Sequence, residues 1–240
     1  MDESGELVVD RGGRLPVAPV VDLALFGIAI AARGRPGRTG ADLAAWTLLH
    51  LGGADDEYGR TRAVDLLAGL RRDGLPARLR LVGELPPAQR GRLLARAAGV
   101  VGALDLVGER APHEVARLLV ETALLFVPAP DPSGRVPAPS PAPGTPGAAA
   151  GGRDPVPSVL AGCAAGTPVL APDLPAVRVV AAALTGVIMV APGAPTQVWA
   201  RAAAGPLPVP PTPDERWAAL RRLRRSPFCP DRPALADEAR

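Results

Sequence analysis

The sequence predicts an α/β fold built on a single Rossmann-like, doubly wound parallel sheet, with a disordered insert and a C-terminal helix. From about residue 44 onward, short apolar runs of strand length alternate with amphipathic segments of helical spacing, which is the pattern of βα units. The short runs are almost continuously apolar, as expected of strands that helices cover on both faces. Parallel neighbours joined by helices need right-handed crossovers, and these produce a doubly wound sheet.

Six apolar runs are the expected strands, at residues 46–51, 78–82, 103–107, 124–127, 168–170 and 187–190. The expected helices have apolar residues three and four apart, and most begin at a Pro or end just before a Gly, which are frequent helix boundaries. They span residues 62–72, 87–98, 112–122, 158–165, 175–184, 195–203 and 214–225.

The 240 residues suffice for one large domain, at about 100–200 residues per domain. We expect a linker-like segment at 1–40, the sheet domain at 41–205, and a Pro-rich linker, terminal helix and tail at 206–240. Residues 130–152 are almost entirely Pro, Ala, Gly and Ser. Such a tract buries little apolar surface, so we expect a disordered insert there.

Cysteine content and hydropathy bound the environment of the protein. Cys163 and Cys229 are the two cysteines, too few for a disulfide framework and without metal-site spacing. We therefore expect a reducing, cytoplasmic setting and no bound metal. The most apolar run, residues 20–32, is shorter than the ~20 residues that span a bilayer, and the acidic start does not fit a secretory signal.

The charge pattern does not favour nucleic acid as a ligand. The net charge is only +3, and aromatic residues make up 3% of the chain, whereas a nucleic-acid binder concentrates basic charge among stacking aromatics. One dense basic cluster lies on the expected terminal helix and is either a solvated helix face or a patch for an anionic partner or membrane surface. Its members are Arg221, Arg222, Arg224 and Arg225.

An ordered series of motifs between residues 79 and 204 points to a family. LRLVG (79–83) and LDLVG (104–108) are strands that end in Val-Gly, and ALLFVP (123–128) is the strand before the long insert. PSVL (157–160) followed by AAGTPVLAPD (164–173) is the most specific stretch. In this order the motifs resemble the C-terminal, nucleotide-sugar-binding half of GT-B glycosyltransferases, particularly the retaining family 4 type.

This resemblance implies half of a GT-B fold, with a nucleotide-sugar as substrate and no cofactor or metal. A complete GT-B enzyme has two Rossmann-like domains and binds its acceptor in the cleft between them. The length of this chain allows one such domain. We therefore expect a partner protein to supply the acceptor domain.

The donor site implied by the resemblance departs from the family at its cations. Family members carry an Arg and a Lys in the loop after the first strand, where they neutralise the diphosphate that leaves during transfer. Here Gly53 and Tyr58 stand at those places. Asp55 and Asp56 add negative charge that would repel a diphosphate.

The family's acidic pair is missing as well. Its two glutamates, eight residues apart, map to Arg153 and Ala161. Asp154 is adjacent and is the one candidate catalytic residue. The candidate donor-binding residues come from the loops and helix starts at the strand ends: Gly52, Gly53, Glu84, Arg110 and Ser158.

Four further side chains have two interpretations each. Arg60, Arg62 and Arg110 are either surface arginines or replacements for the missing cations. His50 ends the first strand, where ligands bind in open α/β sheets, and is either a packing residue or a catalytic one.

Two functional hypotheses follow. The chain is either a glycosyltransferase-like protein, with reduced activity by itself, or a non-catalytic pseudo-glycosyltransferase that serves as a binding or partner subunit. Whether it is an enzyme stays open. The sequence has no Ser-His-Asp order, HExxH, GxGxxG or Walker loop, so hydrolase, metalloprotease, NAD-dependent and ATPase activities have no motif in their favour.

Overall fold

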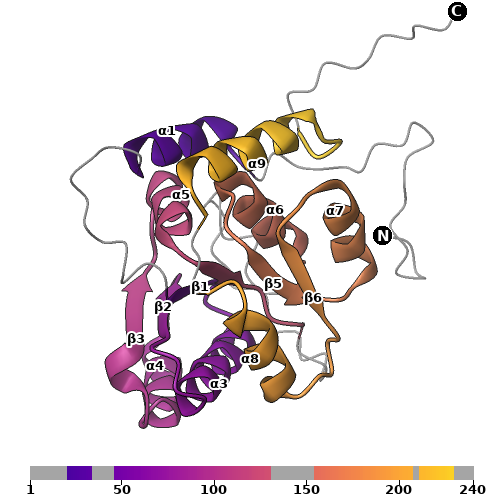
Figure 1. Ribbon diagram of the computed structural model, residues 1–240. Coiled ribbons are helices and arrows are strands. Elements are labelled where there is room, and N and C mark those ends of the chain that lie inside the picture. The colour runs from indigo at the N-terminus through magenta and orange to yellow at the C-terminus, as the bar shows by residue number, and fades with distance from the viewer. Residues whose placement is uncertain (1–20, 34–45, 131–153, 208–210, 230–240) are drawn as a thin grey trace, which may run out of the picture.

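The computed structural model describes residues 21–33, 46–130, 154–207 and 211–229 (Figure 1). The expected insert, except Pro130, and much of the expected linker and tail segments lie outside these residues. Within them, one parallel sheet has the strand order β3-β2-β1-β4-β5-β6. Its strands are β1 (Thr47–Leu51), β2 (Arg78–Val82), β3 (Leu104–Gly108), β4 (Leu124–Phe126), β5 (Val169–Pro172) and β6 (Val187–Val190). The predicted sheet is confirmed, with strand ends that differ from the prediction by at most two residues.

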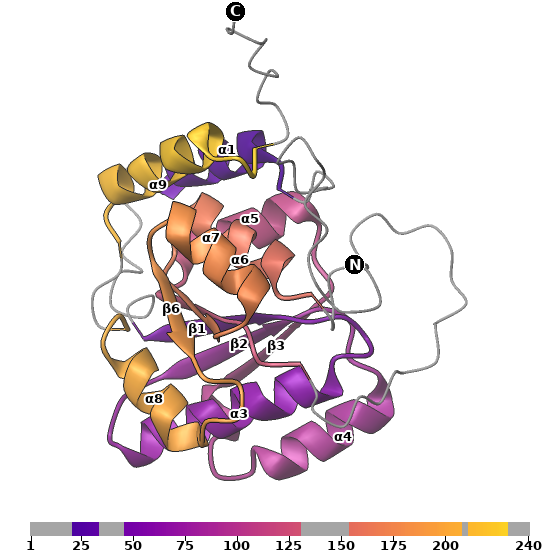
Figure 2. The ribbon, with the colours of Figure 1, turned by 90° about the vertical axis from the view of Figure 1, so that its right-hand side faces the viewer.

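Helices cover both faces of the sheet (Figures 1 and 2). One face is covered by α3 (Glu57–Arg72), α4 (Pro87–Arg96) and α8 (Thr196–Ala204). The other is covered by α5 (Pro112–Glu121), α6 (Val156–Ala165) and α7 (Pro175–Ala183), with α1 (Leu23–Arg33) and α9 (Pro213–Arg225) packed outside them. A short 3-10 turn, Val101–Ala103, leads into β3.

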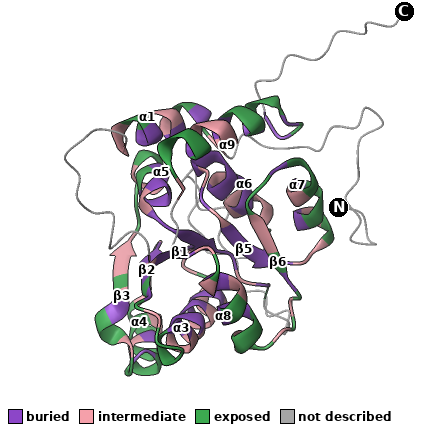
Figure 3. Ribbon diagram, viewed as in Figure 1, coloured by how far each residue is buried: buried purple, intermediate pink, exposed green. Residues whose placement is uncertain are grey.

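The central strands are buried on both sides, as Figure 3 shows for β1 and β5. Leu48 and Leu49 of β1 point to opposite faces and neither is exposed to solvent. Each therefore belongs to a different apolar cluster, one on each face of the sheet. This two-sided burial explains why the strands are almost continuously apolar in sequence.

The helix α1 lies within the expected linker-like segment and was not predicted. Its start is capped by Asp22, whose carboxylate accepts a hydrogen bond from the amide of Ala24 at 2.9 Å. Phe26 and Ile30 are buried in the cluster that α1 shares with α5, α6 and α9. The apolar run is thus a surface-packed helix of the sheet domain.

A buried arginine anchors α9. Arg216 is inaccessible to solvent, and its Nη1 donates to the carbonyl of Ala165 and the hydroxyl of Thr167, both at 2.8 Å. Burial lowers the pKa of the Arg216 guanidinium. Gly166 ends α6 with φ 63°, and a Cβ there would lie 2.6 Å from the Cα of Arg216. This close approach fixes α9 against the end of α6.

Both cysteines are free and buried. Burial raises the pKa of the Cys163 thiol to about 12, which leaves it an unreactive thiol at neutral pH. Cys229 was expected in an irregular tail. The structure instead buries it, next to Phe228, in the cluster beneath α9.

Candidate functional site

The candidate site lies at the carboxyl ends of β1 and β4. The chain order along the sheet reverses between these two strands, and open α/β sheets bind ligands at such a switch point. Two helices start at this edge of the sheet, α3 after β1 and α6 after β4. A helix start binds anions because its first amides have no acceptor within the helix and its dipole is positive.

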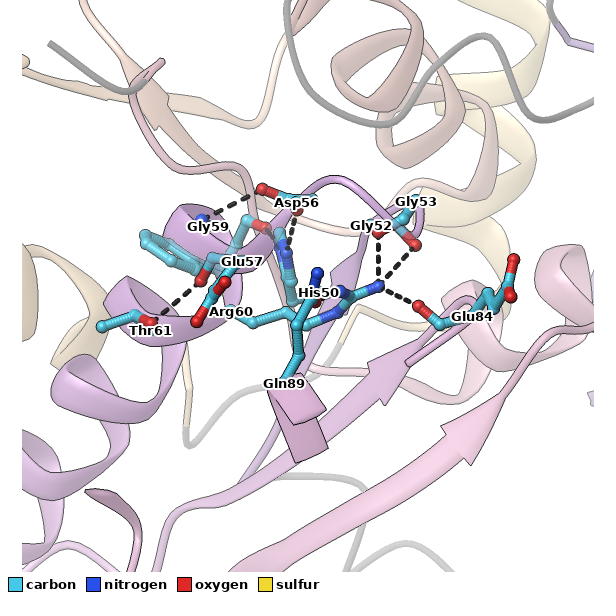
Figure 4. A network of polar contacts seen from close by, with 11 residues as sticks. His50, Gly52, Gly53, Asp56, Glu57, Gly59, Arg60, Thr61, Glu84 and Gln89 are labelled. Atoms are coloured by element: carbon cyan, nitrogen blue, oxygen red, sulfur yellow. Dashed lines mark hydrogen bonds and ion pairs between the residues drawn. The ribbon is translucent and has the colours of Figure 1, made fainter. Parts of the chain in front are cut away.

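At the start of α3 the protein's own carboxylate occupies this anion position. The Oδ1 of Asp56 accepts a hydrogen bond from the amide of Gly59 at 3.0 Å. A Cβ at Gly59 would lie 2.3 Å from that carboxylate, and one at Gly52 would lie 2.5 Å from it. The two glycines thus make room for the Asp56 carboxylate, which lies between them (Figure 4).

His50, on β1, contacts the Asp56 carboxylate through its imidazole ring. Its Nε2 lies 2.7 Å from Asp56 Oδ2, and its Nδ1 lies 3.1 Å from the carbonyl oxygen of Phe126. A carbonyl only accepts hydrogen bonds, and so does an ionised carboxylate, so both contacts are satisfied when both ring nitrogens carry a proton. The ring is 2% exposed. His50 therefore serves as a packing and hydrogen-bonding residue that joins β1, β4 and the loop before α3.

Arg60 ties together the loops after β1 and β2. Its Nη2 donates to the carbonyls of Gly53 and Glu84, with a longer contact of 3.4 Å to Gly52, and its Nη1 donates to Gln89 at 2.9 Å (Figure 4). Only 1% of the residue is exposed. Burial lowers the pKa of Arg60, while nearby carboxylates, Asp56 first among them, oppose this effect. The interpretation of Arg60 as a surface arginine is wrong, because the guanidinium is committed to protein oxygens.

A glycine also allows a close contact between the same pair of loops. Gly83, just after β2, has φ 120°, and a Cβ there would lie 1.7 Å from the carbonyl oxygen of Gly52. The two loops therefore touch backbone to backbone. The Val-Gly ending of this strand reflects that contact.

The start of α6 contains fewer of the protein's own polar groups. Asp154 accepts a hydrogen bond from the amide of Val156 at 2.9 Å, and Pro157 has no amide hydrogen. Among the described residues, neither the amide nor the hydroxyl of Ser158 has a hydrogen-bond partner. The half-buried Ser158 is therefore the group at this helix start that a ligand could bind.

Of the other predicted residues, Glu84 shares a contact with the site, whereas Arg110 and Arg62 contact other parts of the chain. Glu84 contributes its backbone carbonyl to Arg60 and leaves its side chain exposed. Arg110 follows the edge strand β3 and donates to the carbonyl of the preceding residue. Arg62 has a 3.4 Å contact with the carbonyl of Ala194. The structure thus brings Gly52, Gly53 and the backbone of Glu84 together, but not Arg110.

A groove of about 220 Å³ runs between α3 and α4 beside the site. It is crossed by a two-bond ion pair in which Arg92 Nε donates to Glu57 Oε1 at 2.6 Å and Arg92 Nη2 donates to Glu57 Oε2 at 2.8 Å. This pair lowers the pKa of Glu57. The cation of Arg92 is therefore engaged by the first turn of α3.

The part of the chain that the structure describes lacks two further features. It contains no group of three or more His, Cys, Asp or Glu side chains placed to bind a metal ion. It also contains no helix with the length and apolar character needed to cross a membrane.

Sequence reasoning missed the roles of Asp56 and Arg60, whereas the packing interpretation of His50 agrees with its burial and its two contacts. One signal was present, since an Asp followed by a Glu before a helical pattern indicates a helix start. That signal places the start of α3 at Glu57, five residues before the expected residue 62. The contact between His50 and Asp56 joins a strand to a loop, and no local pattern indicates it.

Comparison with solved structures identifies proteins of the same fold. WaaG, a glycosyltransferase involved in lipopolysaccharide biosynthesis, matches with a TM-score of 0.52 and 20% identity over 86% of this chain and 47% of its own. HepE of Anabaena in complex with UDP and glucose matches with a TM-score of 0.52 and 16% identity, over 84% of this chain and 50% of its own. Sucrose-phosphate synthase from Thermosynechococcus elongatus gives 0.55 and 19%, over 87% and 48%.

No protein-family model and no curated protein sequence matches the chain. The chain spans about half the length of the solved glycosyltransferases that it resembles. The fold is therefore the Rossmann-like half of a GT-B glycosyltransferase fold.

Proposed function

We propose that this chain is the nucleotide-sugar-binding half of a retaining, family 4 type glycosyltransferase, and that its own capacity for sugar transfer is reduced. The shared fold supports a nucleotide-sugar ligand, as does the presence of UDP and glucose in one protein of that fold. The observation that carries the reduced activity is the Asp56 carboxylate at the start of α3.

A nucleoside diphosphate leaving group accumulates negative charge as the glycosidic bond breaks. Cations and helix-start amides aimed at that charge are each worth about 2.7–4 kcal/mol, or about 10²–10³-fold in rate. At the start of α3, the Gly59 amide donates to Asp56 and the Arg60 guanidinium donates to backbone carbonyls. Neither group is directed at an incoming phosphate, and Asp55 adds further negative charge.

The polar groups that remain unengaged and could bind a donor lie on the α6 side of the switch point. Ser158 offers an amide and a hydroxyl, and Asp154 lies at the same helix start. We propose Gly52, Gly53, Glu84 and Ser158 as the residues nearest the donor, with Asp154 as the candidate catalytic carboxylate. Arg110, on the edge-strand side, would contact only an extended ligand.

The acceptor side needs a second protein in this proposal. The chain spans about half of the solved glycosyltransferases that it matches, and a GT-B cleft forms between two domains. We propose that a partner protein supplies the acceptor domain. The two free, buried cysteines agree with a cytoplasmic location for this assembly.

A second candidate function is a non-catalytic pseudo-glycosyltransferase that acts as a binding or partner subunit. The specific observation in its favour is the run Asp55, Asp56 and Glu57 at the start of α3, the next helix after β1. Asp56 takes the amide that a phosphate would need and Asp55 adds negative charge beside it, while Glu57 is paired with Arg92.

Titration calorimetry with UDP, GDP and ADP tests donor binding, and release of nucleoside diphosphate from nucleotide-sugars tests transfer. We expect weak binding of at least one nucleotide, with a Kd in the range of about 0.1–1 mM, and no release above background by the chain alone. Absence of binding to all three nucleotides would contradict the donor-binding role. Rapid release by the isolated chain would contradict reduced activity.

A further inference from the structure

The sheet ends at β6, and the outer side of this strand is open within the described part of the chain. β6 pairs with β5 only. The carbonyls of Gly186 and Val190 face β5, where they accept hydrogen bonds from Val169 and Asp173 at 2.8 Å. Because alternate residues of a strand direct their backbone groups to opposite sides, Val187 and Met189 direct theirs away from the sheet.

The stretch that forms this edge carries no charged side chain of its own, and the arginines that contact it, Arg222 at Thr185 and Arg62 at Ala194, do so before and after β6. Residues 179–200 contain no Asp, Glu, Lys, Arg or His, in a chain in which 21% of residues are charged. Val179 of α7, Met189 of β6 and Val198 of α8 are 45%, 41% and 46% exposed. Figure 2 shows these three elements together at the side of the molecule that faces the viewer. An uncharged, apolar edge strand readily pairs with another strand.

The opposite edge of the same sheet is protected by charge. Asp105 lies on β3, 53% exposed, with its Oδ2 3.6 Å from Arg80 Nε. The exposed Glu109 and Arg110 follow at the end of the strand. The chain thus has the usual charged protection at one edge and lacks it at the other.

We propose that β6 pairs with β6 of a second copy of this chain. A twofold axis brings a strand against itself in the antiparallel sense, so the same surface meets itself. For β6 this contact sets no like charges against each other, whereas two copies of β3 would bring two Asp105 carboxylates together. Charge therefore selects the β6 edge for a symmetric dimer.

The outward backbone groups fix the register of this pairing. With Ile188 on the twofold axis, Val187 faces Met189 of the second copy, and each such pair exchanges two hydrogen bonds. Four hydrogen bonds then cross the interface. The two Ile188 residues form a pair without hydrogen bonds, whose Cα atoms lie about 4.5 Å apart.

Analytical ultracentrifugation of the full chain tests the dimer over protomer concentrations from about 1 to about 100 µM. We expect a dimer in the wild type and a dissociation constant raised about tenfold or more by Met189→Arg, which desolvates a charge on each copy. Val101→Arg is the matched control, because Val101 is 50% exposed beside the β3 edge. It should leave the dimer intact. Circular dichroism checks that both variants are folded.

Oxidative cross-linking tests the register. Ile188→Cys should form a disulfide between copies, because the expected Cα separation lies within the roughly 4.4–6.8 Å that a disulfide spans. Val101→Cys should remain monomeric on a non-reducing gel. The native cysteines are buried and do not compete.

A wild type that is monomeric at every concentration would overturn the proposal, as would a dimer that Met189→Arg leaves unchanged. A monomer that becomes a dimer when residues 1–20 are deleted would also overturn it. That result would assign the β6 edge to a segment of the same chain.

Discussion

The two helix starts at the switch point of the sheet differ in what occupies them. At α3, the Asp56 carboxylate takes the Gly59 amide, His50 supports it, and Arg60 joins the adjoining loops. At α6, the Val156 amide is the one that a side chain of the described residues engages, through Asp154. The parallel sheet places a helix start after β1 and another after β4, and each could bind an anion. At α3, a carboxylate of the protein, that of Asp56, occupies this position.

From this difference we expect the α3 side to contribute mainly to the stability of the fold and the α6 side mainly to ligand binding. The α3 side contains close backbone contacts and buried polar groups, so substitutions there should mainly change the free energy of unfolding. The α6 side has fewer internal bonds, so substitutions there should cost less stability.

Gly83→Ala should have the largest effect. Its Cβ would lie 1.7 Å from the carbonyl oxygen of Gly52, at a φ of 120°. We expect a loss of more than about 4 kcal/mol in the free energy of unfolding, measured by denaturant titration, or no folded protein. Gly91→Ala is the control, since nothing lies within 4 Å of that site in α4. It should stabilise the protein by up to about 1 kcal/mol.

Arg60→Met should cost about 3 kcal/mol, because it removes the buried guanidinium that donates to the carbonyls of Gly53 and Glu84. Arg62→Met, on the same helix, removes one 3.4 Å contact and should cost less than about 0.5 kcal/mol. Equal losses in the two variants would contradict the structural role of Arg60.

The two aspartates at the helix starts allow a direct comparison. Asp56→Ala removes a helix cap and the partner of His50, and should cost about 2 kcal/mol. Asp154→Ala removes one amide contact and should cost about 0.5–1 kcal/mol. Thermal unfolding of both variants measures the difference. A larger loss for Asp154→Ala would reverse the contrast.

The sheet could be predicted because the sequence signals of its strands and helices lie within the elements themselves. Continuous apolar runs such as 187–190 specify buried strands, and most helix boundaries carry Pro or Gly. The helix α1 was missed although Asp22 is a helix-capping residue directly before an apolar run. Its Phe26 and Ile30 are buried by α5 and α9, which lie far along the chain.

The candidate site could be predicted only in its location. That Gly53 and Tyr58 stand where the resembled family has its cations stays a prediction from the sequence. The burial of Arg60 could not be predicted, because arginine is rarely buried and its carbonyl acceptors lie on two loops 24 and 7 residues away. The contact between His50 and Asp56 depends on the turn between them, which the close approach of Gly52 makes possible.

The central claim is that the α3 side of the switch point lacks a cation for a diphosphate. Calorimetric titration of UDP into the double variant Gly53→Arg/Tyr58→Lys tests it most directly, with Gly53→Gln/Tyr58→Gln as the neutral control. We predict that the cationic pair lowers the Kd for UDP about tenfold or more, since each charge-assisted hydrogen bond is worth about 1.5–3 kcal/mol, and that the neutral pair leaves it unchanged. An unchanged Kd in the cationic variant would contradict the claim.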